Sequence, residues 1–216
     1  RAGTRTEGST TLTTAQPIPW APWALDRVES LAVRMAAFGS VAAATGIGDM
    51  VCRMGDELRA DDGDGNWVRL LRNGDRVTVL AWDQDDAPLD PALAGAAVNS
   101  WSPRPLPVEP VSFIGVGSLS GPGCWHLAEH DPGEVMSAFL SDDASALEMD
   151  DFLSHCGDDE GIDYSTARPL LGHLARHPFG DTSVLARVAA PFGLSAVEAG
   201  RSKLAELASW WPPTTV

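Results

Sequence analysis

Residues 67–83 read WVRLLRNGDRVTVLAWD, and the fold is most directly inferred from this stretch. Two runs rich in Val and Leu flank Asn73-Gly74-Asp75. Asn-Gly between such runs is the strongest short-range signal for a β-hairpin, because both residues accept the positive φ of a type I′ turn. We therefore predict a β-hairpin over residues 67–83.

Further strands are expected on either side of this hairpin. Residues 50–54 (MVCRM) precede it, joined by the acidic loop 61–66, and residues 111–116 (VSFIGV) have the composition of a buried strand. The stretch 84–110 carries six prolines and a short Ala-rich segment, which is typical of a long connection. The expected sheet is small and antiparallel.

Helical spacing of apolar residues dominates the two flanks of this sheet. Residues 24–39 indicate an amphipathic helix that stops at Gly39 and continues or restarts over 41–45. After the strands, helical spacing recurs in the segments 124–130, 134–140, 144–153, 166–176, 182–192 and 196–211. Strands followed by helices indicate an α+β fold: a small sheet (hairpin 67–83 plus strand 111–116), an N-terminal helix and a helical C-terminal half.

The composition predicts one domain behind a tail. Residues 1–19 are dominated by Thr, Ser, Gly and Pro, and too little apolar surface is present there to repay the entropy of ordering. The remainder, with 44% hydrophobic residues and eight Trp in the chain, is sufficient for a core. We predict a disordered tail over 1–19 and a single domain over 20–216, with a mixed part (20–120) and a helical part (121–216).

Charge and cysteine usage restrict the classes of partner and compartment. A net charge of −15 argues against binding to nucleic acid or to an anionic membrane, since both need a local excess of Lys and Arg, and it favours a basic protein partner. No window approaches the roughly 18 apolar residues needed to span a bilayer. Three scattered cysteines are not a disulfide framework, so we predict a reducing, cytoplasmic setting.

The most unusual feature of the charge pattern is a segment of one sign. From Pro105 to Ala167 there are 63 residues with 13 Asp and Glu and neither Lys nor Arg. Such a segment favours long-range attraction of a cationic surface, although most charge runs are merely solvated. Its clustered acids form the predicted partner-binding face: Asp142, Asp143, Glu148, Asp150, Asp151, Asp158, Asp159 and Glu160.

Histidines in two i, i+4 pairs suggest a second kind of site. His126 with His130, and His173 with His177, would each project from one face of a helix, where two imidazoles reach one metal. Residues 126–130 also fit H-x-x-E-H, in which Glu129 would be the general base of a zinc enzyme. Asp131-Pro132 ends that helix at once, which favours a structural role for these histidines. The candidate zinc ligands are Cys124, His126, His130, His155, His173 and His177.

Two other patterns are compatible with function. Asp62-Gly-Asp64-Gly-Asn66 resembles the start of a calcium loop, but the glycine and the bidentate acid that should follow are missing, and a turn between strands explains the same residues. Residues 184–207 have the order of a helix-turn-helix, although the would-be reading helix has few basic residues.

These observations favour a non-catalytic acidic interaction protein, in one version an inhibitor or immunity-type partner of a basic protein such as a nuclease toxin. In this interpretation no cofactor is needed, and the sequence leaves the oligomeric state open. The alternatives are a zinc-dependent enzyme that uses His126, Glu129 and His130, and a transcriptional regulator that uses residues 184–207.

Overall fold

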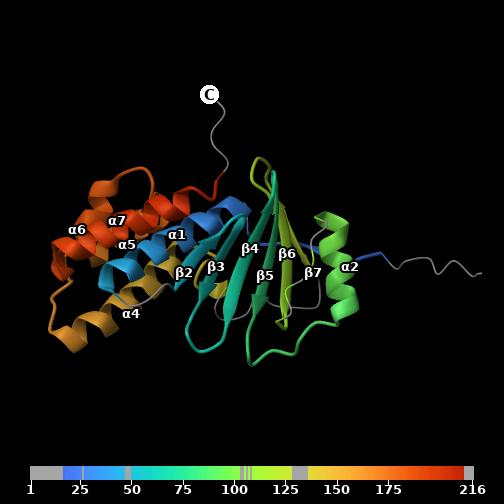
Figure 1. The fold of residues 1–216 in the computed structure, drawn as a ribbon, viewed down its shortest axis with the longest axis horizontal. Coiled ribbons are helices and arrows are strands. Elements are labelled where there is room, and N and C mark those ends of the chain that lie inside the picture. The colour runs from blue at the N-terminus through green and yellow to red at the C-terminus, as the bar shows by residue number, and fades with distance from the viewer. Residues whose placement is uncertain are drawn as a thin grey trace, which may run out of the picture.

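A computed structural model describes residues 17–25, 27–46, 50–102, 105, 107, 109–127 and 136–211, with the backbone alone at 158–160. Its centre is a seven-stranded antiparallel sheet in the order β1-β7-β6-β5-β4-β3-β2 (Figure 1). From β2 to β7 each strand pairs with the next one along the chain, and β1 extends this meander beside β7. The strands are β1 (Trp20–Trp23), β2 (Val51–Met54), β3 (Glu57–Asp61), β4 (Trp67–Asn73), β5 (Arg76–Trp82), β6 (Phe113–Ser118) and β7 (Cys124–Leu127).

The hairpin predicted over 67–83 is confirmed as β4 and β5, with a turn one residue later than expected. Asn73 pairs with Arg76, so Gly74 and Asp75 are the two central residues. Gly74 has a φ of 61°, and within the described chain no residue other than glycine has a positive φ. A positive φ at the first central position alone is typical of a type II′ turn rather than of the expected type I′.

The α+β class is confirmed, but the prediction of a small sheet is wrong, because β1, β3 and β7 add to the expected strands. Each of the three has only four or five residues. β7 also replaces a predicted helix: residues 124–127 are a strand in which Cys124 joins the core on one face of the sheet and Leu127 the core on the other. So short an alternation does not differ enough from a helical pattern to be recognised in the sequence.

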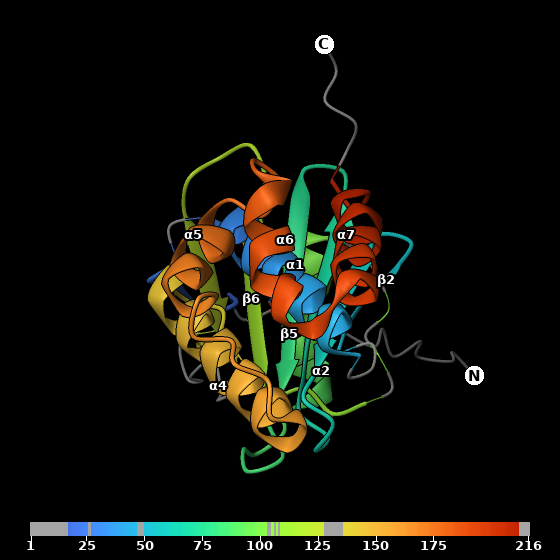
Figure 2. The same cartoon turned by 90° about the vertical axis from the view of Figure 1, so that its left-hand side faces the viewer.

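Most of the helices cover one face of the sheet, as Figures 1 and 2 show. α1 (Val28–Thr45) packs directly on the strands, and the C-terminal helices pack on α1. The helical C-terminal half is thereby confirmed for residues 136–211. Its elements are α4 (Asp142–Glu160), α5 (Leu171–Arg176), α6 (Thr182–Ala189) and α7 (Leu194–Ala208), with 3₁₀ turns at Arg168–Leu170 and Ala190–Phe192.

The opposite face is partly covered by α2 (Pro91–Trp101), which lies where a long connection was predicted. That prediction is wrong for these residues. The start of α2 has a clear local cause, since the carboxylate of Asp90 accepts hydrogen bonds from the backbone N–H groups of Ala92 and Leu93 at 2.8 and 2.9 Å. Pro91 supplies the fixed φ that suits a first helical position.

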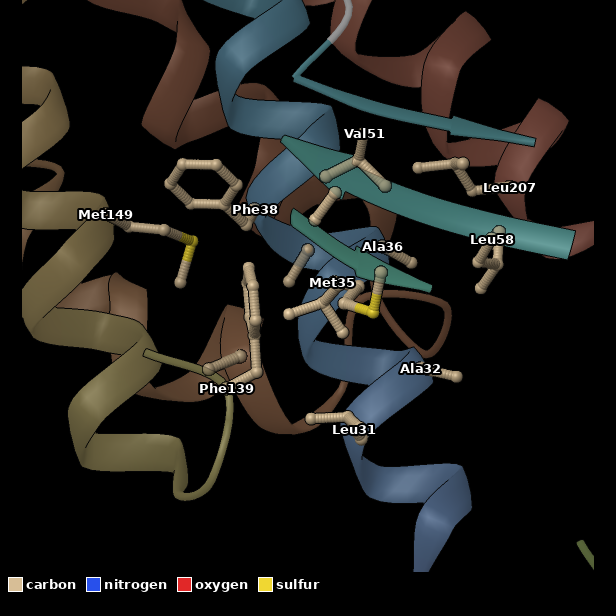
Figure 3. Close-up of a cluster of buried hydrophobic side chains, with 14 of the residues drawn as sticks. Leu31, Ala32, Met35, Ala36, Phe38, Val51, Leu58, Phe139, Met149 and Leu207 are labelled. Carbon is tan, nitrogen blue, oxygen red and sulfur yellow. The ribbon is translucent and has the colours of Figure 1, made fainter. Parts of the chain in front are cut away.

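Gly39 lies inside α1, so the predicted helix stop at this residue is wrong. A Cβ atom at position 39 would lie 2.7 Å from Cβ of Val51 and 3.0 Å from Cδ1 of Leu207. The glycine therefore permits a close approach of α1, β2 and α7, and Figure 3 shows Val51 and Leu207 beside this helix. The helix ends instead at Gly46, whose φ is 77°.

Candidate functional site

A cavity of about 310 Å³ opens between the helical layer and one end of the sheet. It collects residues from α1, from the ends of β3 and β5, from the segment before α4 and from α4 itself. Its described lining consists of Phe38, Met50, Ala60, Asp61, Asp62, Asp64, Asn66, Gln84, Asp85, Ala138, Phe139 and Glu148. Five of these twelve residues are acidic and none is basic, so the site is strongly anionic.

The floor of the cavity is aromatic and rigid. Phe38 of α1 and Phe139 are 4% and 3% exposed, and their rings meet edge to face with centroids 5.8 Å apart. Phe152 of α4 makes a similar contact with Phe38, at 5.4 Å. Figure 3 shows Phe38, Phe139 and Met149 facing one another between α1 and α4. Because these side chains belong to the main core, the floor is held in place by the packing of the whole domain.

The acidic rim is built by two turns at the same end of the sheet. In the β3–β4 turn, the Asp62 carboxylate accepts hydrogen bonds from the backbone N–H groups of Asp64 and Asn66, at 2.8 and 3.1 Å, and from the Asn66 side chain at 2.7 Å. Asn66 Oδ1 in turn accepts a hydrogen bond from the backbone N–H of Gln84, at 2.8 Å, in the loop after β5. This chain of bonds fixes the two turns relative to each other. The loop Asp62–Asn66 thus forms a turn between strands, the interpretation that the sequence analysis preferred to a calcium loop.

The rim carboxylates differ in what they already bind. Asp61 accepts a hydrogen bond from Arg59 at 2.9 Å, and Asp62 is committed to its turn. Asp64 and Asp85 are exposed, and within the described residues neither carboxylate has a hydrogen-bond or ion-pair partner. Glu148 of α4 is also exposed and completes the rim from the helical side. Asp64 and Asp85 are therefore the carboxylates most available to a ligand.

The acids of the predicted face on α4 have different surroundings in the structure: some form ion pairs and others are exposed. Asp142 is bonded to Arg34 of α1 at 2.9 Å and to Arg176 of α5 at 2.8 Å, and Asp150 is bonded to Arg168 at 2.7 Å. The one-signed segment is thus partly neutralised by arginines from outside it, which weakens the long-range attraction expected from its sequence. Asp143 and Asp151 are exposed, Glu148 lines the cavity, and the side chains of Asp158, Asp159 and Glu160 lie outside the described residues.

The environment of Asp142 stabilises its charged form. Burial alone would raise the pKa of this carboxyl group, but hydrogen bonds from Arg176 and Arg34 outweigh that effect, and its pKa is lowered below the ordinary value of 3.8. Arg34 also donates to the carbonyl groups of Phe139 and Leu140, both at 3.0 Å. Asp142 therefore fixes the segment that supplies Phe139, and its role is structural.

The described candidate zinc ligands do not converge. His126 lies on strand β7, where its ring stacks on Phe113 and its Nδ1 is 2.8 Å from the carbonyl oxygen of Leu127. The rings of His173 and His177 are 5.3 Å apart at the exposed end of α5, His155 is exposed on α4, and Cys124 is buried. Glu129 and His130 lie outside the described residues. Within the described chain, no three His, Cys, Asp or Glu side chains form a group that holds a metal ion.

The region predicted as a possible helix-turn-helix is used for packing. One face of α7 packs against α1, and Gly200 lies close to the carbonyl group of Ser40. Two basic side chains of α7 are paired within the helix: Arg201 with Glu198 at 3.4 Å, and Lys203 with Glu206 at 3.2 Å. These pairs leave little positive charge for DNA phosphates, and the arrangement favours the αα-hairpin interpretation.

The sequence analysis missed the cavity, although part of its signal was available. Asp61 is the last residue of β3, Asp62 and Asp64 lie in the turn after it, and Asp85 lies in the turn after β5; neither turn contains a basic residue. In an antiparallel meander the turns after alternate strands lie at the same end of the sheet, so a correct strand count would have brought these acids together. Phe38 and Phe139 gave no local signal, because buried aromatic residues at helical spacing are typical of any core.

No described helix combines the length and the apolar character needed to cross a membrane. Comparisons of the chain with protein-family models, with curated proteins and with solved structures found no match.

Proposed function

We propose that this chain is a non-catalytic binding protein for a basic protein partner, and that an Arg or Lys side chain of the partner occupies the acidic cavity. The observation that carries this proposal is the combination of an aromatic floor and a rim of carboxylates without a basic residue among the described lining residues. The partner class agrees with the net charge of −15.

A long basic side chain suits both parts of the cavity. The methylene stem of Arg or Lys gains free energy when it packs against apolar walls, here Phe38 and Phe139, while the charged end stays with polar groups. A cation close to an aromatic ring is further stabilised by the ring quadrupole. The carboxylates of Asp64 and Asp85, which have no described partner, supply the counter-charge.

The spacing of the acids favours an organic cation over a metal ion. No three of the described His, Cys, Asp or Glu side chains form a group that could hold a metal ion, so the described carboxylates of the rim do not converge on one point. A guanidinium or ammonium group needs no such convergence and binds to several separate carboxylates.

The excess negative charge supports a macromolecular partner in particular. A one-signed field accelerates the encounter with a basic surface by orders of magnitude, and this advantage grows with the charge of the partner. Proteins that bind nucleic acid carry such surfaces, so a nuclease-type toxin, with this chain as its inhibitor, is the version of the proposal we favour.

The test uses a fluorescein-labelled hexa-arginine peptide and the full chain, with binding followed by fluorescence anisotropy at low and high salt. We expect Asp64→Asn combined with Asp85→Asn to weaken binding about tenfold or more, which corresponds to about 1.4 kcal/mol. The matched control is Asp143→Asn combined with Asp151→Asn, which removes the same charge from exposed α4 residues outside the cavity lining. We expect it to weaken binding less than about twofold.

Two outcomes would overturn the cavity as the site. An equal loss in both double variants would mean that the peptide responds only to total charge. A loss confined to the α4 variant would place the basic ligand on the α4 surface instead.

A further inference from the structure

Sulfur-containing side chains are concentrated at strand β2, at the edge of the sheet. The chain has five Met and three Cys, and three of these eight residues are Met50, Cys52 and Met54. Met50 and Cys52 are half-buried, and Met54 is 52% exposed. The other five are all buried, with an exposed fraction of 7% or less: Met35, Cys124, Met136, Met149 and Cys156. The sulfur residues at β2 therefore differ from the rest in that solvent reaches them.

These three side chains line one hollow in the surface. It has a volume of about 450 Å³, and its described lining consists of Met50, Cys52, Met54, Arg59, Asp61, Asp62 and Gly63. Val51 packs in the main core against α1. Because successive side chains of a strand alternate, Cys52 and Met54 point to the opposite face of the sheet.

The geometry of a strand brings Cys52 and Met54 within reach of one ion. Residues two apart in a strand are about 6.5 Å from each other and point to the same face. Cys and Met side chains that lean toward each other across this gap can both place sulfur at about 2.3 Å from a metal ion between them, the usual length of a metal–sulfur bond. Met50 lies in a bend directly before β2, so its side chain is not restricted by strand spacing, and it lines the same hollow.

The type of donor atom indicates the type of ion. Thiolate and thioether sulfur are soft ligands that select Cu(I), whereas Mg²⁺ and Ca²⁺ prefer oxygen. Zinc takes thiolate, imidazole and carboxylate ligands, and thioether sulfur is not among its usual donors. Within the described chain no three His, Cys, Asp or Glu side chains form a metal-binding group, and a site with thioether donors does not need one.

We propose that Met50, Cys52 and Met54 form a binding site for Cu(I). The thiol of Cys52 loses its proton to solvent and binds the ion as a thiolate, and the two thioethers complete a three-coordinate site. The oxidation state of the ion does not change on binding. This site is separate from the acidic cavity and does not depend on the proposed function.

The charges around the hollow favour a cation. Asp61 and Asp62 line it, and Arg59 is the one basic residue among its described lining. Arg59 is paired with Asp61 at 2.9 Å, so its positive charge is already compensated. The remaining negative charge attracts Cu(I), and the bound ion in turn compensates the charge of the Cys52 thiolate.

The test measures the transfer of Cu(I) from its coloured bicinchoninate complex to the full chain, in the presence of ascorbate. We expect the unaltered chain to take up one Cu(I) per molecule. Cys52→Ser should weaken binding more than about tenfold, and Met50→Leu and Met54→Leu about tenfold each, because even the outer shell of a metal site contributes that much. Met54 is exposed, so Met54→Leu keeps the inference testable if Cys52→Ser does not fold.

The control variants remove sulfur or charge outside the hollow. Met35→Leu and Cys156→Ala replace core residues that do not line it, and both should keep full binding. Asp64→Asn with Asp85→Asn changes residues that line only the acidic cavity, and it should weaken Cu(I) binding less than about twofold. Failure of the Cu(I) site would therefore leave the proposed function unaffected, and the reverse also holds.

X-ray absorption of the Cu(I) complex identifies the ligands directly. We expect sulfur neighbours alone, with one fewer in Met54→Leu. Oxygen or nitrogen neighbours only, or equal binding by Met54→Leu and the unaltered chain, would overturn the site. A loss confined to Cys52→Ser, with both methionine variants unchanged, would mean an adventitious thiol ligand only and would overturn it as well.

Discussion

The acids of α4 and the acids of the β3–β4 turn differ in whether basic side chains neutralise them in the folded protein. In the sequence the α4 acids are more conspicuous, because they belong to 63 residues without a basic side chain. In the structure Asp142 and Asp150 are bound by Arg34, Arg176 and Arg168, which come from other segments. The shorter acidic turn keeps an exposed carboxylate, that of Asp64, beside an aromatic cavity. A charge run in sequence is therefore a poor guide to an unneutralised charge in space.

The largest expected effect is the loss of stability when Asp142 of α4 is replaced, compared with replacement of its exposed neighbour Asp143. Asp142→Ala leaves Arg34, whose side chain is 11% exposed, without its carboxylate, and we expect a loss of about 2–3 kcal/mol in the free energy of unfolding. Asp143→Ala, at the exposed neighbouring residue, should cost less than about 0.5 kcal/mol. Urea denaturation of both variants measures the difference. Equal costs would show that Asp142 is a surface acid like its neighbour.

A smaller effect is expected within the acidic turn itself. Asp62→Ala removes the acceptor of three hydrogen bonds that close the β3–β4 turn, and we expect a loss of about 1–2 kcal/mol. Asp64→Ala removes a carboxylate without a described partner and should leave stability within about 0.5 kcal/mol. Thermal melts of the two variants provide the check. A larger cost at Asp64 than at Asp62 would contradict our division of the turn into structural and ligand-facing acids.

The ion pairs of Asp142 should also affect how the stability of the protein depends on acid pH. Hydrogen bonds from Arg176 and Arg34 outweigh the effect of burial and lower the folded-state pKa of Asp142 below its ordinary value of 3.8. Asp142 therefore stabilises the folded state above about pH 3.8, and this contribution is lost as the pH falls through the folded-state pKa. Between neutral and strongly acid pH, the free energy of unfolding should therefore fall less steeply for Asp142→Ala than for the unaltered chain. Identical slopes in Asp142→Ala and in the unaltered chain would refute this role for Asp142.

The elements that the sequence predicted well are those with a strong local signal. The Asn-Gly signal of the hairpin and the amphipathic spacing of α1 depend on neighbouring residues, and both elements are present, although the turn is centred on Gly74-Asp75. β3 was missed although Glu57–Asp61 alternates polar and apolar residues, because five residues with two apolar side chains are a weak pattern. The continuation of α1 through Gly39 was not predictable locally, since its cause is contact with Val51 and Leu207.

The candidate site was less predictable than the fold because it is entirely non-local. Phe38, Asp64, Asp85 and Phe139 come from four separate parts of the chain, and only the meander and the packing of α4 on α1 bring them together. Among the residues whose side chains the structure describes, the predicted face on α4 shares only Glu148 with the lining of the cavity. The ion pairs of Asp142 were equally hidden, because Arg34 is 108 residues away in sequence.

The smallest expected effect concerns Asp150, and it separates neutralisation from stability. The Arg168 side chain is 60% exposed, so its ion pair with Asp150 at 2.7 Å competes with water, and the pair should contribute less to stability than the pair of Asp142 with Arg34. A double-mutant cycle with Asp150→Ala and Arg168→Ala measures this coupling, and the same cycle for Asp142 and Arg34 is the matched comparison. A coupling at Asp150 as large as that at Asp142 would contradict the distinction. If the coupling is small, the Asp150–Arg168 pair neutralises charge on the surface of α4 without a measurable contribution to the stability of the fold. The exposed acids at the cavity would then be a better guide to binding than the more numerous acids on the helix.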